Sequence, residues 1–201
     1  FLQLCAGENI QVVNCTTPSN YFHVLRRQMH REFRKPLVIM TPKSLLRHKK
    51  CISNISEFYS KSSFHRVLED DALIKKNNLI SLNKDKKIKK VVICSGKIYY
   101  DLIEAREKFS NPAVVFVRLE QLYPFPAKTL ANVLKKYTNA DFIWCQEEPK
   151  NMGAWNTVRN YIERTLEMIN FKDINVKYVG RKASSSTATG NANKHLAQQK
   201  E

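Results

Sequence analysis

The stretch "VVICSGKIYYDLIEAREKFSNPAVVFVRL", residues 91–119, decides the fold of this chain. It opens with a run of β-branched residues, passes through Gly96 into a helical pattern, and closes with a second β-branched run. Short strands that alternate with helical patterns are typical of a parallel sheet with helices packed on its faces. The stretch therefore predicts a strand, a helix and a second strand of an α/β fold.

The same alternation extends in both directions along the chain. Apolar and β-branched runs predict further strands at residues 9–15, 36–40, 141–146 and 174–180. Helical spacing predicts helices that begin near Thr17 or Ser19, at Ala127 and near Trp155. We therefore expect an α/β fold with parallel or mixed sheets and with helices on both faces.

Each of these three predicted helices carries an apolar stripe at spacings of three and four. The stripes are Phe22, Leu25, Met29 and Phe33; Leu130, Val133, Leu134 and Tyr137; and Trp155, Val158, Ile162 and Leu166. Other segments lack such a pattern. We interpret residues 1–9 as the end of an amphipathic helix, residues 52–90 as a connection with short elements, residues 120–126 as a connection, and residues 181–201 as a polar surface segment.

Composition narrows the kinds of protein that this chain can be. Its 201 residues include 34 basic and 18 acidic side chains, a formal net charge of +16. Basic runs at residues 26–35 and 84–90 lack aromatic residues spaced for base stacking, so we interpret them as solvated surface and expect no nucleic acid partner. No apolar run approaches the roughly 20 residues that span a bilayer, so no membrane segment is expected.

The cysteines and histidines indicate neither a disulfide framework nor a metal site. Five cysteines occur without a CxxC pair, and the odd number favours buried thiols in a reducing compartment. The five histidines lack the tight spacing of metal ligands.

Two predicted strand-to-helix turns are candidates for a site, because ligands of such sheets bind beyond the carboxyl ends of the strands. The turn at residues 94–97, "CSGK", lacks the glycine pattern of known phosphate loops and favours a simple tight turn. The stretch "WCQEEPKNMGAW", residues 144–155, contains the adjacent Glu147 and Glu148. Neighbours on an extended segment point in opposite directions, so we do not expect an acid/base pair. We expect one carboxylate to accept N–H bonds at the start of the next helix and the other to face a neighbouring subunit or domain.

Five stretches of this chain resemble one known family. They lie at residues 15–48, 91–106, 117–126, 144–155 and 178–190, and they include "CTTPSNYFHVLRRQMHREFRKPLVIMTPKSLLRH", "VRLEQLYPFP" and "YVGRKASSSTATG". Together they resemble the carboxyl-terminal part of the 2-oxoglutarate dehydrogenase first component, a thiamine-diphosphate-dependent decarboxylating subunit. The resemblance covers nearly the whole chain, and Thr41 replaces the serine that is usual in the family.

This resemblance implies a division into domains and a reaction. Residues 1–55 would be the last part of a pyrimidine-binding domain, residues 56–90 a connection, and residues 91–201 a transketolase-like carboxyl-terminal domain. The family decarboxylates 2-oxoglutarate on thiamine diphosphate with magnesium and passes the succinyl group to a lipoyl-bearing second component. Its catalytic, cofactor-binding and metal residues would lie upstream of Phe1, so we assign none here and expect this chain alone to be inactive.

The resemblance also implies partners: a homodimer, and the dihydrolipoamide succinyltransferase and dihydrolipoamide dehydrogenase of a multienzyme complex. The location would be bacterial cytoplasm or mitochondrial matrix, and the Lys- and Asn-rich composition favours the former. The candidate effector or interface residues are Arg47, His48, Glu147, Glu148, Asn151, Trp155 and Arg181. Two alternatives stay open, a first component that acts on pyruvate or a branched-chain 2-oxo acid, and a basic nucleic-acid-binding module.

Overall fold

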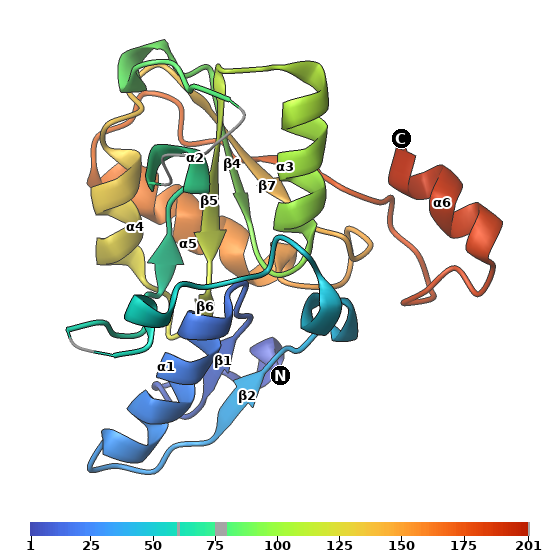
Figure 1. Ribbon diagram of the computed structural model, residues 1–201. Coiled ribbons are helices and arrows are strands. Elements are labelled where there is room, and N and C mark those ends of the chain that lie inside the picture. The colour runs from blue at the N-terminus through green and yellow to red at the C-terminus, as the bar shows by residue number, and fades with distance from the viewer. Residues whose placement is uncertain (60, 75–79, 201) are drawn as a thin grey trace.

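The computed structural model describes residues 1–59, 61–74 and 80–200, and it contains two sheets (Figure 1). The larger sheet has the order β3 (Val67–Leu68), β5 (Val114–Leu119), β4 (Lys90–Cys94), β7 (Asp141–Cys145) and β8 (Lys177–Val179). Its strands are parallel except for β3, which pairs antiparallel with β5. In the smaller sheet, β1 (Gln11–Val13) lies parallel to β2 (Leu37–Ile39) and antiparallel to β6 (Gln121–Tyr123). The predicted α/β class with mixed sheets is confirmed.

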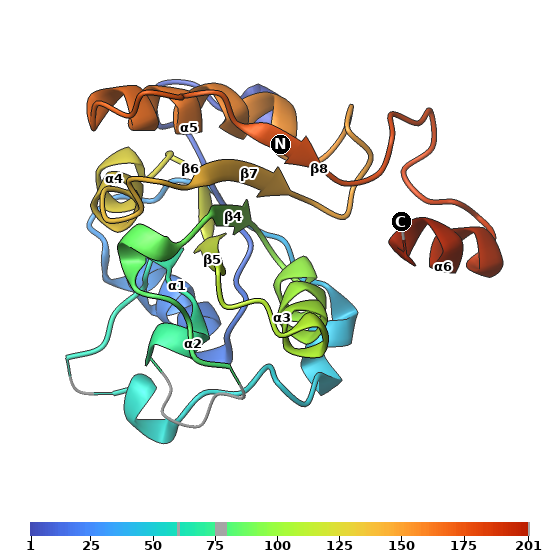
Figure 2. The same ribbon diagram turned by 90° about the horizontal axis from the view of Figure 1, so that it is seen from above.

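Helices cover both faces of the larger sheet, as expected. In Figure 2, α3 (Ile98–Phe109) lies on one side of β4 and β7, and α5 (Trp155–Met168) lies on the other. Alternate residues of β4 serve the two faces: Val91 and Ile93 belong to the core shared with α4 (Ala127–Leu134) and α5, whereas Val92 and Cys94 pack with α3. This period of two is the geometry of a strand that is buried on both sides.

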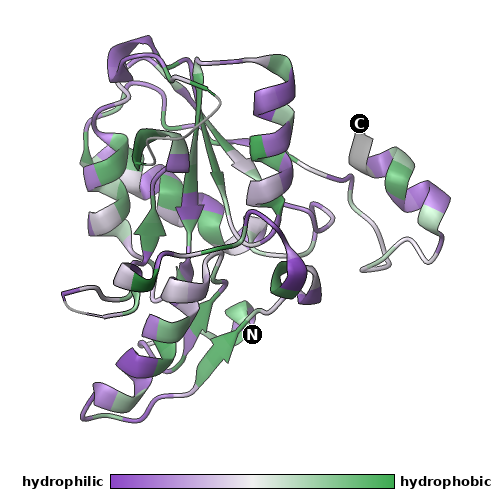
Figure 3. Cartoon of the chain, in the orientation of Figure 1, coloured by the Kyte–Doolittle hydropathy of each residue, from purple (hydrophilic) through white to green (hydrophobic). Residues whose placement is uncertain are grey.

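The three predicted apolar stripes on the helices differ in burial. The stripes predicted for α4 and α5 are buried, and the residues from Leu130 to Tyr137 and from Trp155 to Leu166 that form them contribute to the main core. The stripe on α1 (Pro18–His30) is exposed: Met29 is 72% exposed, and Phe22 and Leu25 are 41% and 45% exposed. The buried residues of α1 are instead Ser19, Asn20, His23 and Val24. Figure 3 shows the apolar colour along β1 and β2 and the polar colour toward the far end of α1.

The start of α1 follows the prediction. Thr17 is the N-cap residue, its hydroxyl accepts a hydrogen bond from the backbone N–H of Asn20 at 3.3 Å, and Pro18 occupies the first helical position. A hydroxyl at this position satisfies a backbone donor that has no partner inside the helix.

Two local predictions are wrong, and a third is incomplete. Residues 1–9 contain a 3-10 helix, Leu2–Leu4, and not the end of an amphipathic helix. Residues 120–126 include strand β6, whose three residues are too few to show a period and whose partner β1 lies more than 100 positions earlier. The polar tail is a surface segment as predicted, but it also contains an unpredicted helix, α6 (Ala192–Lys200), which lies apart from the sheets beyond α3 (Figure 1).

The connection between the sheets consists of short elements, as predicted. Residues 52–90 contain 3-10 helices at Ile55–Glu57 and Asp85–Lys87, strand β3 and the short helix α2 (Asp71–Ile74). The part of the prediction that falls on residues 60 and 75–79 lies outside the described residues. Within the described ranges, no helix combines the length and the apolar character needed to cross a bilayer.

Candidate functional site

The carboxyl ends of β4 and β7 bring the two predicted turns together. Gly96 has φ +76°, and a Cβ atom there would collide with the side chain of Asn14. Glycine is therefore required both for the left-handed backbone and for the close approach. The ammonium group of Lys97 then reaches the carboxylate of Glu147 at 2.6 Å, so an ion pair joins the turn after β4 to the turn after β7.

The turn after β7 is held by the side chain of Gln146, which is 3% exposed. Its amide oxygen accepts hydrogen bonds from the indole N–H of Trp144 at 2.9 Å and from the backbone N–H of Trp155 at 3.0 Å. Its amide nitrogen donates to the carbonyl oxygens of Glu148, Pro149 and Met152. One buried amide thus connects the end of β7 to the first residue of α5.

This arrangement corrects the expectation for Glu147 and Glu148. We expected one carboxylate to accept N–H bonds at the start of α5, but among the described contacts Gln146 takes that place. Gln146 lies two positions after Trp144, so both side chains point to the face that carries α5. The carboxylate of Glu147 instead pairs with Lys97, and Glu148 is exposed. That the two carboxylates do not form an acid/base pair stays a prediction.

Arg181 and Asn151 tie the polar tail to the same turn. The guanidinium of Arg181 donates to the carbonyl oxygen of Glu147 at 2.9 Å and to that of Thr187 at 3.3 Å. The side-chain amide of Asn151 exchanges two hydrogen bonds with the backbone of Ser184, each at 2.9 Å. These contacts hold the start of the tail against the turn after β7.

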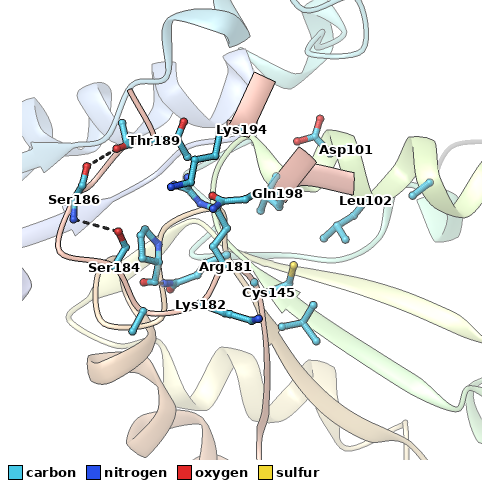
Figure 4. Close-up of a pocket in the computed structure, with 18 residues that line it drawn as sticks. Asp101, Leu102, Cys145, Arg181, Lys182, Ser184, Ser186, Thr189, Lys194 and Gln198 are labelled. Atoms are coloured by element: carbon cyan, nitrogen blue, oxygen red, sulfur yellow. Dashed lines mark hydrogen bonds between the residues drawn. The ribbon is translucent and has the colours of Figure 1, made fainter. Parts of the chain in front are cut away.

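A cavity of about 590 Å³ lies between this tail, α3 and the turn after β7 (Figure 4). Basic residues Arg181, Lys182 and Lys194 line it together with Asp101 of α3 and Cys145 of β7. Partial burial raises the pKa of Asp101, and the nearby Lys97 opposes that shift. Burial, together with the Asp101 carboxylate, raises the pKa of the Cys145 thiol to about 11.

The structure brings five of the seven candidate residues together and leaves two apart. Glu147, Glu148, Asn151, Trp155 and Arg181 all belong to the turn after β7 or contact it. The ring of His48 lies 4.6 Å from that of Tyr100, and Arg47 is exposed. Neither Arg47 nor His48 lines the cavity.

Sequence reasoning missed a group of buried charged residues around β5. Arg118 is 1% exposed and Glu120 is 0% exposed, although both follow an apolar strand run. Asp70 is also 0% exposed; it forms a two-pronged ion pair with Arg106 and accepts the backbone N–H of Phe116 at 2.9 Å. Charged residues are almost never fully buried unless they are paired. A charged residue within or next to an apolar strand run was therefore the available signal of a buried ion pair.

Among residues 1–59, 61–74 and 80–200, no group of three or more His, Cys, Asp or Glu side chains could hold a metal ion. The five cysteines are free thiols, and Cys15, Cys94 and Cys145 are buried. Burial raises the pKa of each of these three thiols, which disfavours the reactive thiolate.

The mixed α/β sheets are consistent with a transketolase-like fold, and two family models match the chain. Residues 1–49 match the model described as transketolase, pyrimidine binding domain. Residues 52–201 match the model described as 2-oxoglutarate dehydrogenase C-terminal, and the chain belongs to that family.

Curated relatives carry the same assignment. The chain is 59% identical over 198 residues to proteins named 2-oxoglutarate dehydrogenase E1 component from Brucella ovis, Brucella canis and Brucella suis. The matched region covers 98% of this chain and 20% of each relative. The resemblance seen in the sequence is thus confirmed, and the chain spans about one fifth of the length of these relatives.

Proposed function

We propose that this chain serves as the carboxyl-terminal part of a 2-oxoglutarate dehydrogenase first component. Such an enzyme decarboxylates 2-oxoglutarate on thiamine diphosphate, with magnesium, and passes the succinyl group to a lipoyl-bearing second component in the citric acid cycle. The observation that carries the proposal is the 59% identity over 198 residues to proteins named as that component. The match of residues 1–49 to a pyrimidine binding domain supports the choice of cofactor.

Within that enzyme, the contribution of this chain is structural. The polar side chains at the carboxyl ends of the strands are already engaged: Gln146 and Arg181 with backbone groups, and Glu147 with Lys97. These residues hold the sheet ends and the tail in place beside the cavity.

The proposed assembly is a homodimer that works with dihydrolipoamide succinyltransferase and dihydrolipoamide dehydrogenase. The word "component" in the names of the relatives supports a multienzyme complex. The exposed stripe on α1 supports a further protein contact there, because Phe22, Leu25 and Met29 present adjacent apolar surface to solvent. A cytoplasmic location is part of the same proposal, and the five free thiols support a reducing compartment.

An anionic effector site at Arg47, His48 and Arg181 stays a prediction. Arg181 lines the cavity beside Lys182 and Lys194, so an anion bound there would meet three basic side chains. Arg47 and His48 would belong to a separate contact.

The test is reduction of ferricyanide that depends on 2-oxoglutarate, thiamine diphosphate and magnesium. The full-length gene product and this chain are assayed side by side, with pyruvate and a branched-chain 2-oxo acid as alternative substrates. We expect activity with 2-oxoglutarate in the full-length protein and none in this chain. Activity with pyruvate alone would change the assigned substrate but not the family. An assembled full-length dimer without activity on any 2-oxo acid would contradict the proposal.

A further inference from the structure

Thr16, in the turn between β1 and α1, directs all of its polar groups to residues far away in the sequence. Its backbone N–H donates to Glu120 at 2.9 Å, and its hydroxyl donates to the other carboxylate oxygen of Glu120 at 2.5 Å. Its carbonyl oxygen accepts from the hydroxyl of Tyr100 at 2.5 Å and from the thiol of Cys51 at 3.3 Å. Thr16 is 0% exposed, so water does not compete for these bonds.

Two further residues complete this cluster. The guanidinium of Arg118 donates to the Thr16 hydroxyl at 3.2 Å. The amide of Asn20, on the first turn of α1, donates to Glu120 at 2.8 Å and also bonds both backbone groups of His65. Asn20, Arg118 and Glu120 are each 2% exposed or less. In a buried network of this kind, a polar group that loses its partner carries its full desolvation cost, so the loss of any of these bonds is destabilising.

The cluster joins the two regions that match different families. Thr16 and Asn20 lie in the region that matches a pyrimidine binding domain, whereas Tyr100, Arg118 and Glu120 lie in the region that matches the 2-oxoglutarate dehydrogenase C-terminal family. In Figure 1, β5 leads from the larger sheet directly to β6, which pairs with β1. Arg118 and Glu120 therefore stand where the larger sheet meets the smaller one.

Apolar contacts alone stabilise the position of α1 only weakly. The separate core around β1 and α1 has three buried apolar residues, Val13, Cys15 and Val24, whereas the main core gathers residues from both sheets, α4 and α5. A core of that size cannot offset the conformational entropy of a 13-residue helix and two strands. Within this chain, polar contacts with the other region therefore contribute to the order of α1.

We propose that Thr16, through its bonds to Glu120 and Arg118, couples the local unfolding of α1 to that of the larger sheet, so that the two unfold together. We call this role of Thr16 a latch. With Thr16 in place, α1 and β5 share one cooperative unit. When the hydroxyl is lost, the Glu120 carboxylate keeps fewer donors inside the protein, and α1 opens independently of β5. This coupling does not depend on which 2-oxo acid the enzyme uses.

The test is hydrogen exchange measured by mass spectrometry on the full-length protein, with peptides that cover residues 18–30 and 114–119. In the natural protein, we expect both regions to exchange with similar protection. Thr16→Val removes the hydroxyl at nearly constant volume, and we expect the α1 peptides to exchange about tenfold faster or more, with little change in the β5 peptides. Thr16→Ser keeps the hydroxyl and should restore the natural pattern.

Two further variants separate the latch from general loss of stability. Thr165→Val makes the same change at a residue that is also 0% exposed but bonds only within α5, to Tyr161. We expect it to leave the ratio of α1 to β5 exchange unchanged. Tyr100→Phe removes one bond to Thr16 and should give a smaller selective effect if Thr16→Val does not fold. Equal acceleration of α1 and β5 in Thr16→Val, or no acceleration of α1 in either variant, would overturn the proposal.

Discussion

The side-chain oxygen of Gln146 accepts the backbone N–H of Trp155 at 3.0 Å, across nine positions of sequence. This contact makes Gln146, and not its acidic neighbours, the residue that shapes the turn. We expect Gln146→Glu to lower the free energy of unfolding by about 2–4 kcal/mol, because three carbonyl oxygens lose their donor and face a carboxylate. Urea unfolding measures the change. Glu148→Gln, at an exposed neighbouring position, is the control, and equal losses in the two variants would contradict this role of Gln146.

The Lys97–Glu147 pair should contribute little, because both side chains are partly exposed, at 30% and 25%. We expect Glu147→Gln to cost about 0.2–1 kcal/mol, and less at high salt. A double-mutant cycle with Lys97→Met isolates the energy of the pair.

In the full-length enzyme, the pH profile of decarboxylation should be unchanged in Glu147→Gln and in Glu148→Gln. A shifted kinetic pKa with intact assembly would show that one of these carboxylates takes part in the chemistry.

Asp70 and Arg106 form a pair that is almost completely buried, with side-chain exposures of 0% and 4%. Removal of one partner leaves an uncompensated charge in the protein interior, so we expect Asp70→Asn to cost about 3–5 kcal/mol. The exposed Asp141–Lys177 pair offers a matched comparison, because the same change, Asp141→Asn, breaks a pair that water already solvates and should cost far less. Thermal unfolding that gives similar losses for both variants would argue against the buried pair.

The pH dependence of stability should report on Glu120. Burial raises the pKa of this carboxyl above its ordinary value of 4.5, and Arg118, Thr16 and Asn20 oppose the shift. A folded pKa above the unfolded one means that the folded state holds the proton more tightly. Its stabilising contribution is then present below the unfolded pKa and is lost as the pH rises through the folded pKa.

The corresponding experiment compares the natural chain with Glu120→Gln in urea between about pH 4 and pH 7. We expect the difference in unfolding free energy, natural minus variant, to fall as the pH rises. An increase over the same range would mean that the hydrogen-bond donors outweigh burial and that the folded pKa is lowered.

Cys145 should resist alkylation in the folded protein. With a pKa of about 11, its thiolate fraction at pH 8 is on the order of one in a thousand. We expect iodoacetamide to leave Cys145 unmodified at pH 8 in the folded state and to label it after unfolding in urea, as mass spectrometry can follow. Labelling of folded Cys145 at the rate of an unstructured cysteine would contradict its buried, protonated state.

Much of the fold could be predicted from local patterns, because the spacing of apolar residues that marks a strand or a helix repeats over a few neighbouring positions. The runs at residues 91–95 and 113–119 became β4 and β5, and the stripes around Leu130 and Ile162 became the buried faces of α4 and α5. Thr17, one of the two caps predicted beside Ser19, could be proposed because its hydroxyl acts within three residues. The family could also be recognised, since its characteristic stretches are contiguous.

The features that local patterns missed depend on partners that are distant in sequence. The stripe on α1 has helical spacing, but spacing does not tell which face meets the core, and here Asn20 and His23 face inward while Met29 faces out. Likewise, a carboxylate near a helix start suggested a cap at Glu147 or Glu148, but the amide of Gln146 reaches that place from the inner face of the strand.

The sequence by itself therefore determined most of the longer strands and helices in their order, the cap at the start of α1, and the family to which the chain belongs. Only the tertiary structure decided that Glu120 meets Thr16 across 104 positions and that Arg106 meets Asp70 across 36. The physical reason is that a period is a property of adjacent residues, whereas a buried charge can be stable only beside a particular partner. Chain folding alone brings that partner into reach.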